Sequence, residues 1–217
     1  MAIIDISTNH SLVNQYVTEL RDVDIQSDRL RFRKNLERLG AIFAYEISKK
    51  LDYADIEVET PMGIAASKII ANQPVLATIL RAGIPLHQGF LQFFDQADNA
   101  FVSAYRRHRK DGTFEISMDH VSCPRIDNRP LIICDPMLAT GQSMNTSIEA
   151  LLSFGQPSQI HIAVVIASTE ALENLSRTHP EVTIWTAAID EELTARSYIV
   201  PGLGDAGDLA YGKKSRD

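Results

Sequence analysis

The sequence predicts an α/β fold in which a central, mostly parallel sheet is flanked by helices. From residue 74 onward, apolar runs that are typical of buried strands alternate with amphipathic runs that are typical of helices. Strands joined through helices in this way pair in parallel, with helices on both faces of the sheet. The chain has 217 residues, of which 45% are hydrophobic, so it can form one large domain or a domain with an appended lobe.

The segment before this alternation predicts two helices and a hairpin. Apolar residues recur on one helical face over residues 12–20, and a longer helix begins near Ser27 or Asp28 and runs to about Leu51. Residues 55–60 alternate between apolar and polar side chains, which indicates a half-exposed strand in an arm or edge hairpin. The basic residues of the longer helix are expected to face solvent or another subunit. They are Arg29, Arg31, Arg33, Lys34 and Arg38.

Five apolar runs predict the strands of the sheet. They cover residues 74–80, 101–105, 131–134, 160–166 and 182–188. The second run leads into a hairpin at residues 111–112, an Asp-Gly pair, and residues 119–129 are polar and expected to be irregular. One helix begins at Ile84, another follows the third strand, and a third is capped by Ser168 or Thr169.

Composition argues against several classes of protein. The formal net charge is -7, which gives no support to a nucleic-acid partner. The only cysteines are Cys123 and Cys134, so we expect neither a disulfide framework nor a zinc site, but a reduced, cytoplasmic setting. The N-terminal residues lack the pattern of a secretory signal, and no apolar run is long enough to span a membrane, so no membrane association is expected.

Residues 131–143 carry the strongest functional signal. An apolar strand turns through Asp135 and Pro136 into a loop of small residues, and an amphipathic helix follows. A phosphate in this loop would meet backbone N–H groups and the positive end of the helix dipole. The Asp135 carboxylate suits a ligand that also carries hydroxyls or a divalent cation, as a phosphorylated sugar does. The alternative is an ordinary turn with capping residues, and the loop chemistry alone does not decide between them.

The end of another predicted strand also carries residues that suit an anionic ligand. Arg81 follows an apolar strand, and Gly83 lets the backbone approach a ligand closely. A guanidinium at this point suits a diphosphate, because its fork can bind two oxygens at once. Alone, Arg81 is better explained as a surface residue beside a turn; together with the Asp135 loop, the functional interpretation is favoured. The basic residues 106–110 could cover an anionic ligand or form a solvated loop tip, and His161 is expected to be packed rather than to act as a base.

The C-terminal residues 198–208 form a glycine-rich segment. Three of the chain's 11 glycines lie between Gly202 and Gly207, so this run is expected to be neither a helix nor an ordinary strand. Its exposed backbone groups could wrap a small flat ligand. A flexible tail is the alternative, but the apolar residues Ile199, Val200 and Leu203 indicate that the segment is anchored.

These motifs together resemble the uracil phosphoribosyltransferase family, which has the type-I phosphoribosyltransferase fold. The resemblance covers nearly the whole chain. It is carried by residues 80–83 (Leu-Arg-Ala-Gly), 135–141 (Asp-Pro-Met-Leu-Ala-Thr-Gly), 186–190 (Thr-Ala-Ala-Ile-Asp) and 198–208, and also by residues 12–22 and 58–61. The last long motif is the most specific, because it separates the uracil branch from purine and orotate relatives.

The resemblance implies a pyrimidine-salvage enzyme that converts uracil and 5-phosphoribosyl 1-diphosphate to UMP and diphosphate, with Mg²⁺ held mainly by substrate and water rather than by protein ligands. It implies Asp135, Arg81 and Asp205 as catalytic residues. The implied contacts with 5-phosphoribosyl 1-diphosphate are Arg81, Arg106, Asp135, Pro136, Met137, Leu138, Ala139, Thr140, Gly141, Gln142, Ser143 and Asp205. The implied uracil contacts are Ile199, Gly204, Asp205 and Ala206. No strong general base is evident, and Asp205 is the nearest candidate.

The same resemblance implies one phosphoribosyltransferase domain over residues 1–217. It divides into N-terminal helices (about 10–52), a core (about 70–190) and a base-binding hood (about 191–217), in a homodimer or a higher homo-oligomer. The alternatives are a non-enzymatic, pyrimidine-nucleotide-responsive regulator on the same fold, and a transferase for another base.

Three departures from the family pattern stand out. Gln142 replaces a usual glycine, which is harmless if the residue begins a helix, as we expect, but strained if its φ is positive. Residues 107–110 are basic where the family is usually acidic, and Leu209 replaces a common arginine.

Overall fold

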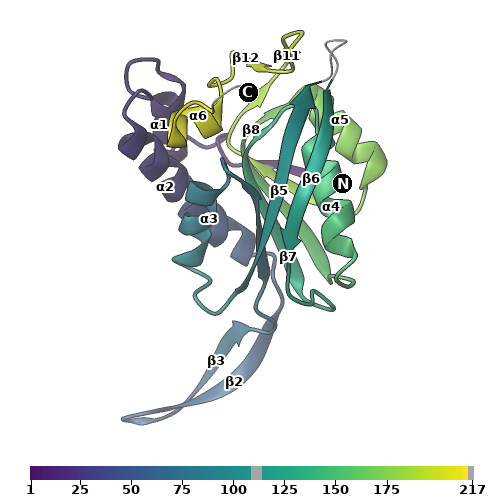
Figure 1. Cartoon of the computed structure of the whole chain (residues 1–217). Coiled ribbons are helices and arrows are strands. Elements are labelled where there is room, and N and C mark those ends of the chain that lie inside the picture. Colours follow the sequence, from purple (N-terminus) through teal and green to yellow (C-terminus); the bar gives the residue numbers. More distant parts are fainter. Residues whose placement is uncertain (109–113, 215–217) are drawn as a thin grey trace.

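A mostly parallel sheet forms the centre of the computed structural model (Figure 1). The structure describes the backbone of residues 1–108 and 114–214, and the side chains of these residues except 104–118. Along the sheet the strand order is β1-β9-β8-β7-β4-β5-β6, and only β5 and β6 pair antiparallel. The strands are β1 (Ala2–Asp5), β4 (Val75–Leu80), β5 (Asp98–His108), β6 (Phe114–Ser122), β7 (Pro130–Leu138), β8 (Gln159–Ser168) and β9 (Thr183–Thr186).

Helices cover both faces of this sheet, as the sequence predicts. They are α1 (Leu12–Arg21), α2 (Arg29–Ser48), α3 (Ile84–Leu91), α4 (Gln142–Leu152), α5 (Thr169–Thr178) and α6 (Ala206–Tyr211). Figure 1 shows α1, α2, α3 and α6 on one side of the sheet and α4 and α5 on the other. A hydrophobic core lies on each face of the sheet. Neighbouring residues of a strand pack into different cores, because strand side chains alternate between the faces. Ile132 packs in the core on the α2 side, and Ile133 packs in the core on the α4 side.

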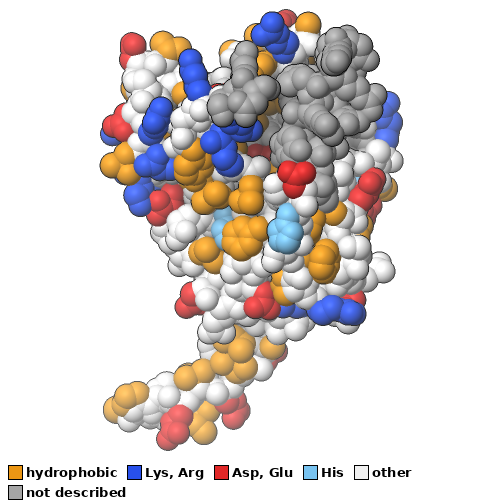
Figure 2. Space-filling view, in the orientation of Figure 1, with side chains coloured by type: hydrophobic (Ala, Val, Ile, Leu, Met, Phe, Trp, Pro, Cys, Tyr) orange, Lys and Arg blue, Asp and Glu red, His pale blue; other side chains and the backbone are white. Residues whose placement is uncertain are grey.

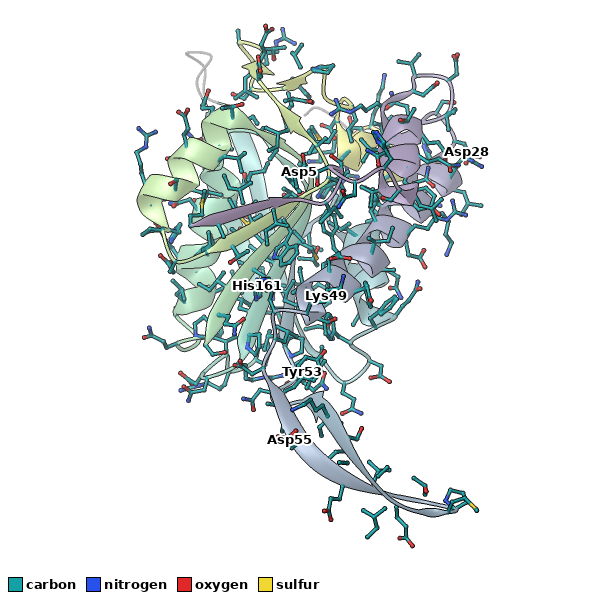
Figure 3. All side chains as sticks on the ribbon, turned by 180° about the vertical axis from the view of Figure 1, so that it is seen from behind. Asp5, Asp28, Lys49, Tyr53, Asp55 and His161 are labelled. Carbon is teal, nitrogen blue, oxygen red and sulfur yellow. The ribbon has the colours of Figure 1, made fainter. Side chains whose placement is uncertain are left out.

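The first two helices begin where capping residues stand. The Ser11 hydroxyl accepts the N–H of Val13 at the start of α1. Asp28 Oδ1 accepts the N–H groups of Leu30 and Arg31 at the start of α2, where Figure 3 labels it. The helix predicted from Ser27 or Asp28 is therefore confirmed, although it ends at Ser48 rather than at about Leu51.

A two-stranded arm projects from the body, as predicted (Figure 1). It consists of β2 (Tyr53–Thr60) and β3 (Gly63–Ile70), and Figure 3 labels Tyr53 and Asp55 near its base. The expectation of a half-buried strand is wrong for the single chain, because no residue of either strand is fully buried. Hydrophobic side chains are visible along the arm in Figure 2, and Met62 and Ile64 are 96% and 73% exposed.

Three strands differ from what the sequence predicts. The pattern of β1 is too short, at four residues, to predict a strand, and β1 is held by parallel pairing with β9. Residues 119–122, expected to be irregular, complete β6, where Phe101 pairs with Ser122. Asp135 and Pro136 were expected to end the third strand, but pairing with β8 extends β7 to Leu138.

The C-terminal part of the chain, residues 189–211, packs against the first helices. It contains short strands β10 (Ile189–Asp190), β11 (Glu192–Leu193) and β12 (Ile199–Val200), followed by α6. The expectation that the glycine-rich run contains no helix is wrong at its end, because Ala206 and Gly207 begin α6. Arg33 Nη1 donates to the carbonyl of Ala210 at 2.7 Å and thus ties α6 to α2.

Some basic residues of α2 have partners within the chain, which corrects the expectation that they face only solvent or another subunit. Arg31 pairs with Glu19 of α1 at 2.9 Å, and Arg33 binds α6. The Arg38 guanidinium lies 5.3 Å from the centre of the Tyr16 ring. Among the residues that the structure describes, no helix has the combination of length and apolar character that a membrane span requires.

Candidate active site

The turn after β4 and the loop after β7 lie at the same edge of the sheet. β4 and β7 are parallel neighbours, with Thr78 opposite Cys134. Gly83 presses this turn against β7: an ideal Cβ there would lie 2.3 Å from Thr78 Oγ1 and 2.8 Å from the carbonyl oxygen of Cys134. Only glycine permits this approach without a shift of the backbone. The sheet therefore brings the Arg81 turn next to the strand that carries Asp135.

Arg81 also contacts the C-terminal segment. Its Nη2 lies 3.3 Å from Oδ1 of Asp208 in α6, and each side chain is about one-third exposed, at 38% and 31%. An ideal Cβ at Gly207 would lie 3.7 Å from the same Nη2. Arg81 Nε is buried and has no hydrogen-bond partner among the described residues. A cationic side chain with unused donors is thus placed between the β4 turn and the glycine-rich segment.

The loop after β7 has the geometry of an anion cradle. Gly141 caps α4 with a left-handed φ of 79°, and Gln142 is the first residue of that helix. Among the described residues, only Asn128 and Ser197 are non-glycine positions with a positive φ. The expectation that Gln142 is an unstrained helix residue is confirmed. The first N–H groups of α4 have no intrahelical acceptor and are directed toward the loop.

Two side chains of the α5 region hold the carbonyl groups of this loop. The Ser168 hydroxyl donates to the carbonyl of Ala139, and Asn174 Nδ2 donates to the carbonyl of Thr140 at 3.1 Å. Ser168 also caps α5, accepting the N–H of Ala171 at 3.0 Å. These two hydrogen bonds, from the cap residue of α5 and from α5 itself, fix the backbone of the loop at the start of α4. The sequence predicts Ser168 only as a helix N-cap, and no sequence pattern predicts a role for Asn174.

Residues 135–138 lie within β7 rather than in a loop. Asp135 and Met137 are partly buried, whereas Pro136 and Leu138 are buried in the protein. Leu138 is 2% exposed and belongs to the core on the α4 side. Of the implied contacts in this stretch, Pro136 and Leu138 can therefore reach a ligand only through their backbone.

The C-terminal segment is anchored, as predicted. Ile199 and Leu203 are buried in the core at 3% and 4% exposure, so Ile199 can offer a ligand only its backbone. Gly202 and Gly204 have φ values of 55° and 95°, which favour glycine. Asp205 is exposed and caps α6, because its Oδ1 accepts the N–H of Asp208 at 2.9 Å.

Some implied residues fall partly outside the described part of the chain. The backbone of Arg106 pairs with Ile116 in the β5–β6 ladder, whereas its side chain is not described. Of the basic run, residues 107 and 108 are described only as backbone, and residues 109–113, with the expected Asp-Gly turn, lie outside the description. Leu209 lies in α6, is partly buried and packs against the core on the α2 side of the sheet.

His161 lies in the interior of the protein. His161 is 4% exposed, and its Nδ1 accepts the indole N–H of Trp185 at 3.3 Å, which confirms that it is a packed residue. Burial lowers the pKa of His161 to about 4.

Within the described residues, no group of three or more His, Cys, Asp and Glu side chains has the arrangement of a metal site. A Mg²⁺ ion here would need substrate oxygens and water as most of its ligands, which fits the way Mg²⁺ binds with phosphate substrates.

The fold is that of the type-I phosphoribosyltransferases. A hypoxanthine phosphoribosyltransferase from Staphylococcus aureus shares the fold, with a TM-score of 0.50, 12% identity, and coverage of 74% of this chain and 76% of the other. The structure of AQ2163 protein from Aquifex aeolicus matches with a TM-score of 0.87 and 29% identity, over 97% of this chain and 98% of that chain.

The sequence comparisons define the family. The family model for uracil phosphoribosyltransferase matches residues 7–213. A uracil phosphoribosyltransferase from Porphyromonas gingivalis is 53% identical over 215 residues, which cover 99% of this chain and all of the relative. The chain belongs to the uracil phosphoribosyltransferase family of pentosyltransferases. Nothing in these comparisons supports the alternative of a non-enzymatic regulator.

Proposed function

We propose that the chain transfers the 5-phosphoribosyl group of 5-phosphoribosyl 1-diphosphate to N1 of uracil, and so supplies UMP by pyrimidine salvage. The observation that carries this proposal is the meeting of Arg81, the α4 cradle and the glycine-rich segment at one edge of the sheet. The family and its relatives agree with this reaction.

The proposed roles of the cradle follow from its donors. Residues Ala139 to Ser143 bind the 5′-phosphate through backbone N–H groups, the Thr140 and Ser143 hydroxyls and the positive end of α4. Asp135, in the last part of β7 before the cradle, accepts hydrogen bonds from the ribose hydroxyls. Bound at both ends in this way, the sugar presents its anomeric carbon to the base.

The leaving diphosphate requires positive charge. Arg81 binds it with its guanidinium fork, and Arg106, a residue of β5, supplies a second positive charge to the same diphosphate. Mg²⁺, when bound to the substrate, supplies further charge to the leaving group. The sugar carbon becomes cationic as diphosphate departs, so stabilisation of the leaving group is the main catalytic requirement.

Uracil is recognised mainly by backbone groups of Ile199 and residues 204–206. Uracil presents an N3–H donor between two carbonyl acceptors, and backbone N–H and C=O groups have a fixed donor or acceptor sense. Cytosine lacks the N3–H and would leave buried polar groups unpaired, which is costly. Asp205 faces the sugar and diphosphate and is the nearest group that could polarise the base.

We also propose that residues 1–217 work as one domain within a homodimer or a higher homo-oligomer in the cytoplasm. The exposed apolar residues of the arm support self-association, since Met62, Ile64 and Ile69 are 96%, 73% and 50% exposed. Both cysteines are free thiols, which agrees with a reducing compartment.

A panel of bases tests the proposed substrate. The purified chain is incubated with 5-phosphoribosyl 1-diphosphate, Mg²⁺ and either uracil, cytosine, orotate or hypoxanthine, and the nucleotide products are separated. We expect UMP from uracil and at least about 100-fold lower kcat/KM for the other bases, because a site built to bind polar groups strongly rejects unmatched ones. Efficient use of another base, or the absence of UMP, would refute the proposal.

A further inference from the structure

We propose that Arg21 and Asp190 are positioning residues for uracil: their ion pair fixes the turn at Gly202, which lies between the proposed uracil contacts Ile199 and Gly204 to Ala206. This inference rests on the proposed function. It also accounts for two motifs that the reaction itself leaves unused, residues 12–22 and residues 186–190.

The pair joins the first helix to the strand that follows the core. Arg21 Nη1 lies 2.8 Å from Asp190 Oδ2, and Arg21 Nη2 lies 2.8 Å from Asp190 Oδ1, so the contact is a two-bond fork. The side chains are 24% and 7% exposed. The residues are 169 positions apart, and the contact therefore depends on the complete fold.

The same two side chains bind both backbone groups of Gly202. The N–H of Gly202 donates to Asp190 Oδ2 at 2.9 Å, and Arg21 Nη1 donates to the carbonyl of Gly202 at 3.1 Å. The turn is tight, because an ideal Cβ at Gly202 would lie 2.1 Å from the carbonyl oxygen of Ile199. Gly204 to Ala206 follow directly, so the direction of the proposed uracil contacts is set at this turn.

Asp190 is also linked to the phosphate cradle. In the parallel pairing of β10 with β8, Asp190 lies opposite Ser168. The hydroxyl of Ser168 in turn donates to the carbonyl of Ala139 in the cradle. The uracil segment and the cradle are therefore both held at the carboxyl end of β8. Alignment of uracil N1 with the sugar carbon requires this separation to be fixed, because small misplacements of reacting atoms slow a reaction strongly.

A purely structural ion pair in the same lobe provides a matched control. Arg31 binds Glu19 through Nε at 3.0 Å and Nη2 at 2.9 Å, also as a fork. This pair joins α1 to α2, and none of its hydrogen bonds reaches Gly202 or the cradle. If the Arg21–Asp190 pair served only to hold the lobe together, its loss and the loss of the Arg31–Glu19 pair would have the same effects.

The experiment compares Arg21→Met, Arg21→Lys, Asp190→Asn and the control Arg31→Met with the wild-type chain. Steady-state kinetics give kcat and the KM for each substrate, and thermal unfolding shows which variants are folded at the assay temperature. We expect the uracil KM to rise on the order of 10- to 100-fold in Arg21→Met and Asp190→Asn, with the KM for 5-phosphoribosyl 1-diphosphate changed less than about twofold. Arg21→Lys, which keeps the charge but loses the fork, is expected to lie between these variants and the wild type.

Hydrogen exchange over residues 199–206 is the second readout, and it needs no activity. Exchange should be faster in Arg21→Met than in the wild type and unchanged in Arg31→Met. A wild-type uracil KM in folded Arg21→Met, or an equal rise in folded Arg31→Met, would overturn the positioning role. If the wild-type chain forms no UMP, the proposed function fails instead, and unchanged exchange in Arg21→Met would then refute the pair's hold on the turn.

Discussion

Arg81 and Asp208, which are 127 positions apart in the sequence, lie in contact across the candidate site, with 3.3 Å between Nη2 and Oδ1. This contact joins the end of β4 to α6 and places the cation proposed to bind diphosphate beside the segment proposed to bind uracil. Both side chains are partly exposed, so the pair contributes little to stability. Because this ion pair is weak and open to solvent, a bound substrate could compete with Asp208 for the guanidinium group of Arg81.

Replacing Arg81 should affect activity far more than stability. We expect Arg81→Ala to lower kcat/KM on the order of 100- to 1000-fold, as the removal of a group that stabilises transition-state charge does. Its thermal midpoint should stay close to the wild-type value, because the ion pair with Asp208 is partly exposed. The control is Arg125→Ala, which removes the exposed pair with Asp127. Equal activity in the two variants would contradict the role of Arg81.

Loss of Asn174 should weaken binding of the ribose substrate. Asn174→Ala removes the donor to the Thr140 carbonyl, and we expect the KM for 5-phosphoribosyl 1-diphosphate to rise about tenfold, the effect of one hydrogen bond of about 1.4 kcal/mol. The uracil KM should not change. Asn145→Ala is the control, because the described hydrogen bonds of the Asn145 side chain go to Glu149 and to His179 beyond α5, and not to the cradle. A rise of the same size in Asn145→Ala would mean that the packing of these elements, rather than the bond to Thr140, matters.

Substitutions at two close-packed glycines should distinguish a loss of stability from a change in the geometry of the site. An ideal Cβ at Gly83 would lie 2.8 Å from the Cys134 carbonyl oxygen, and one at Gly89 would lie 2.0 Å from the Glu37 carbonyl oxygen. We expect Gly83→Ala and Gly89→Ala each to lower the free energy of unfolding by roughly 1–3 kcal/mol, the cost of overpacking. At a temperature where both variants are folded, only Gly83→Ala should raise the KM for 5-phosphoribosyl 1-diphosphate. Unaltered kinetics in Gly83→Ala would contradict its place in the site.

His161 should make stability depend on pH. Burial lowers its pKa to about 4 in the folded chain, so the unfolded chain binds a proton near pH 6.5 that the folded chain does not. The stability contributed by neutral His161 is complete above pH 6.5 and is lost as pH falls from 6.5 toward 4, by about 3 kcal/mol in total. Urea unfolding of the wild type and of His161→Gln should show a difference that is constant above pH 6.5 and changes below it.

Fluorescence gives a direct check on the same group, because Trp185 is the only tryptophan and donates its indole N–H to His161. The emission of the folded chain should remain constant from pH 8 to pH 5 and change with a midpoint near 4. A midpoint near 6.5 would show that His161 is not buried as described.

Local signals in the sequence were sufficient to predict where much of the candidate site lies in the fold. Apolar strand runs located Arg81 and Asp135, and the helix after Gly141 allowed Gln142 to be predicted as an unstrained first residue. These features depend on short-range chemistry: the burial of strands, the conformational freedom of glycine and the capping of helices.

Contacts that depend on strand order were not predictable in this way. The hydrogen bond from Asn174 to the cradle requires β8 to lie beside β7, and the pairing of Arg21 with Asp190 requires β10 to lie beside β8. No local pattern specifies these neighbours. The start of α6 was missed because glycine disfavours helices, whereas the Asp205 cap and packing against α2 stabilise one there. The roles of Asp135, Arg106 and Asp205 toward substrates stay predictions.

The most direct test of the central claim is the initial rate of UMP formation from labelled uracil, 5-phosphoribosyl 1-diphosphate and Mg²⁺, measured side by side for the wild-type chain and for Asp135→Asn. Asparagine keeps the shape of the side chain but removes the charge that is proposed to hold the ribose hydroxyls. We expect UMP from the wild type and a rate at least about 100-fold lower from folded Asp135→Asn, because the sugar would lose its alignment. No UMP from the wild type, or equal rates from both, would contradict the account.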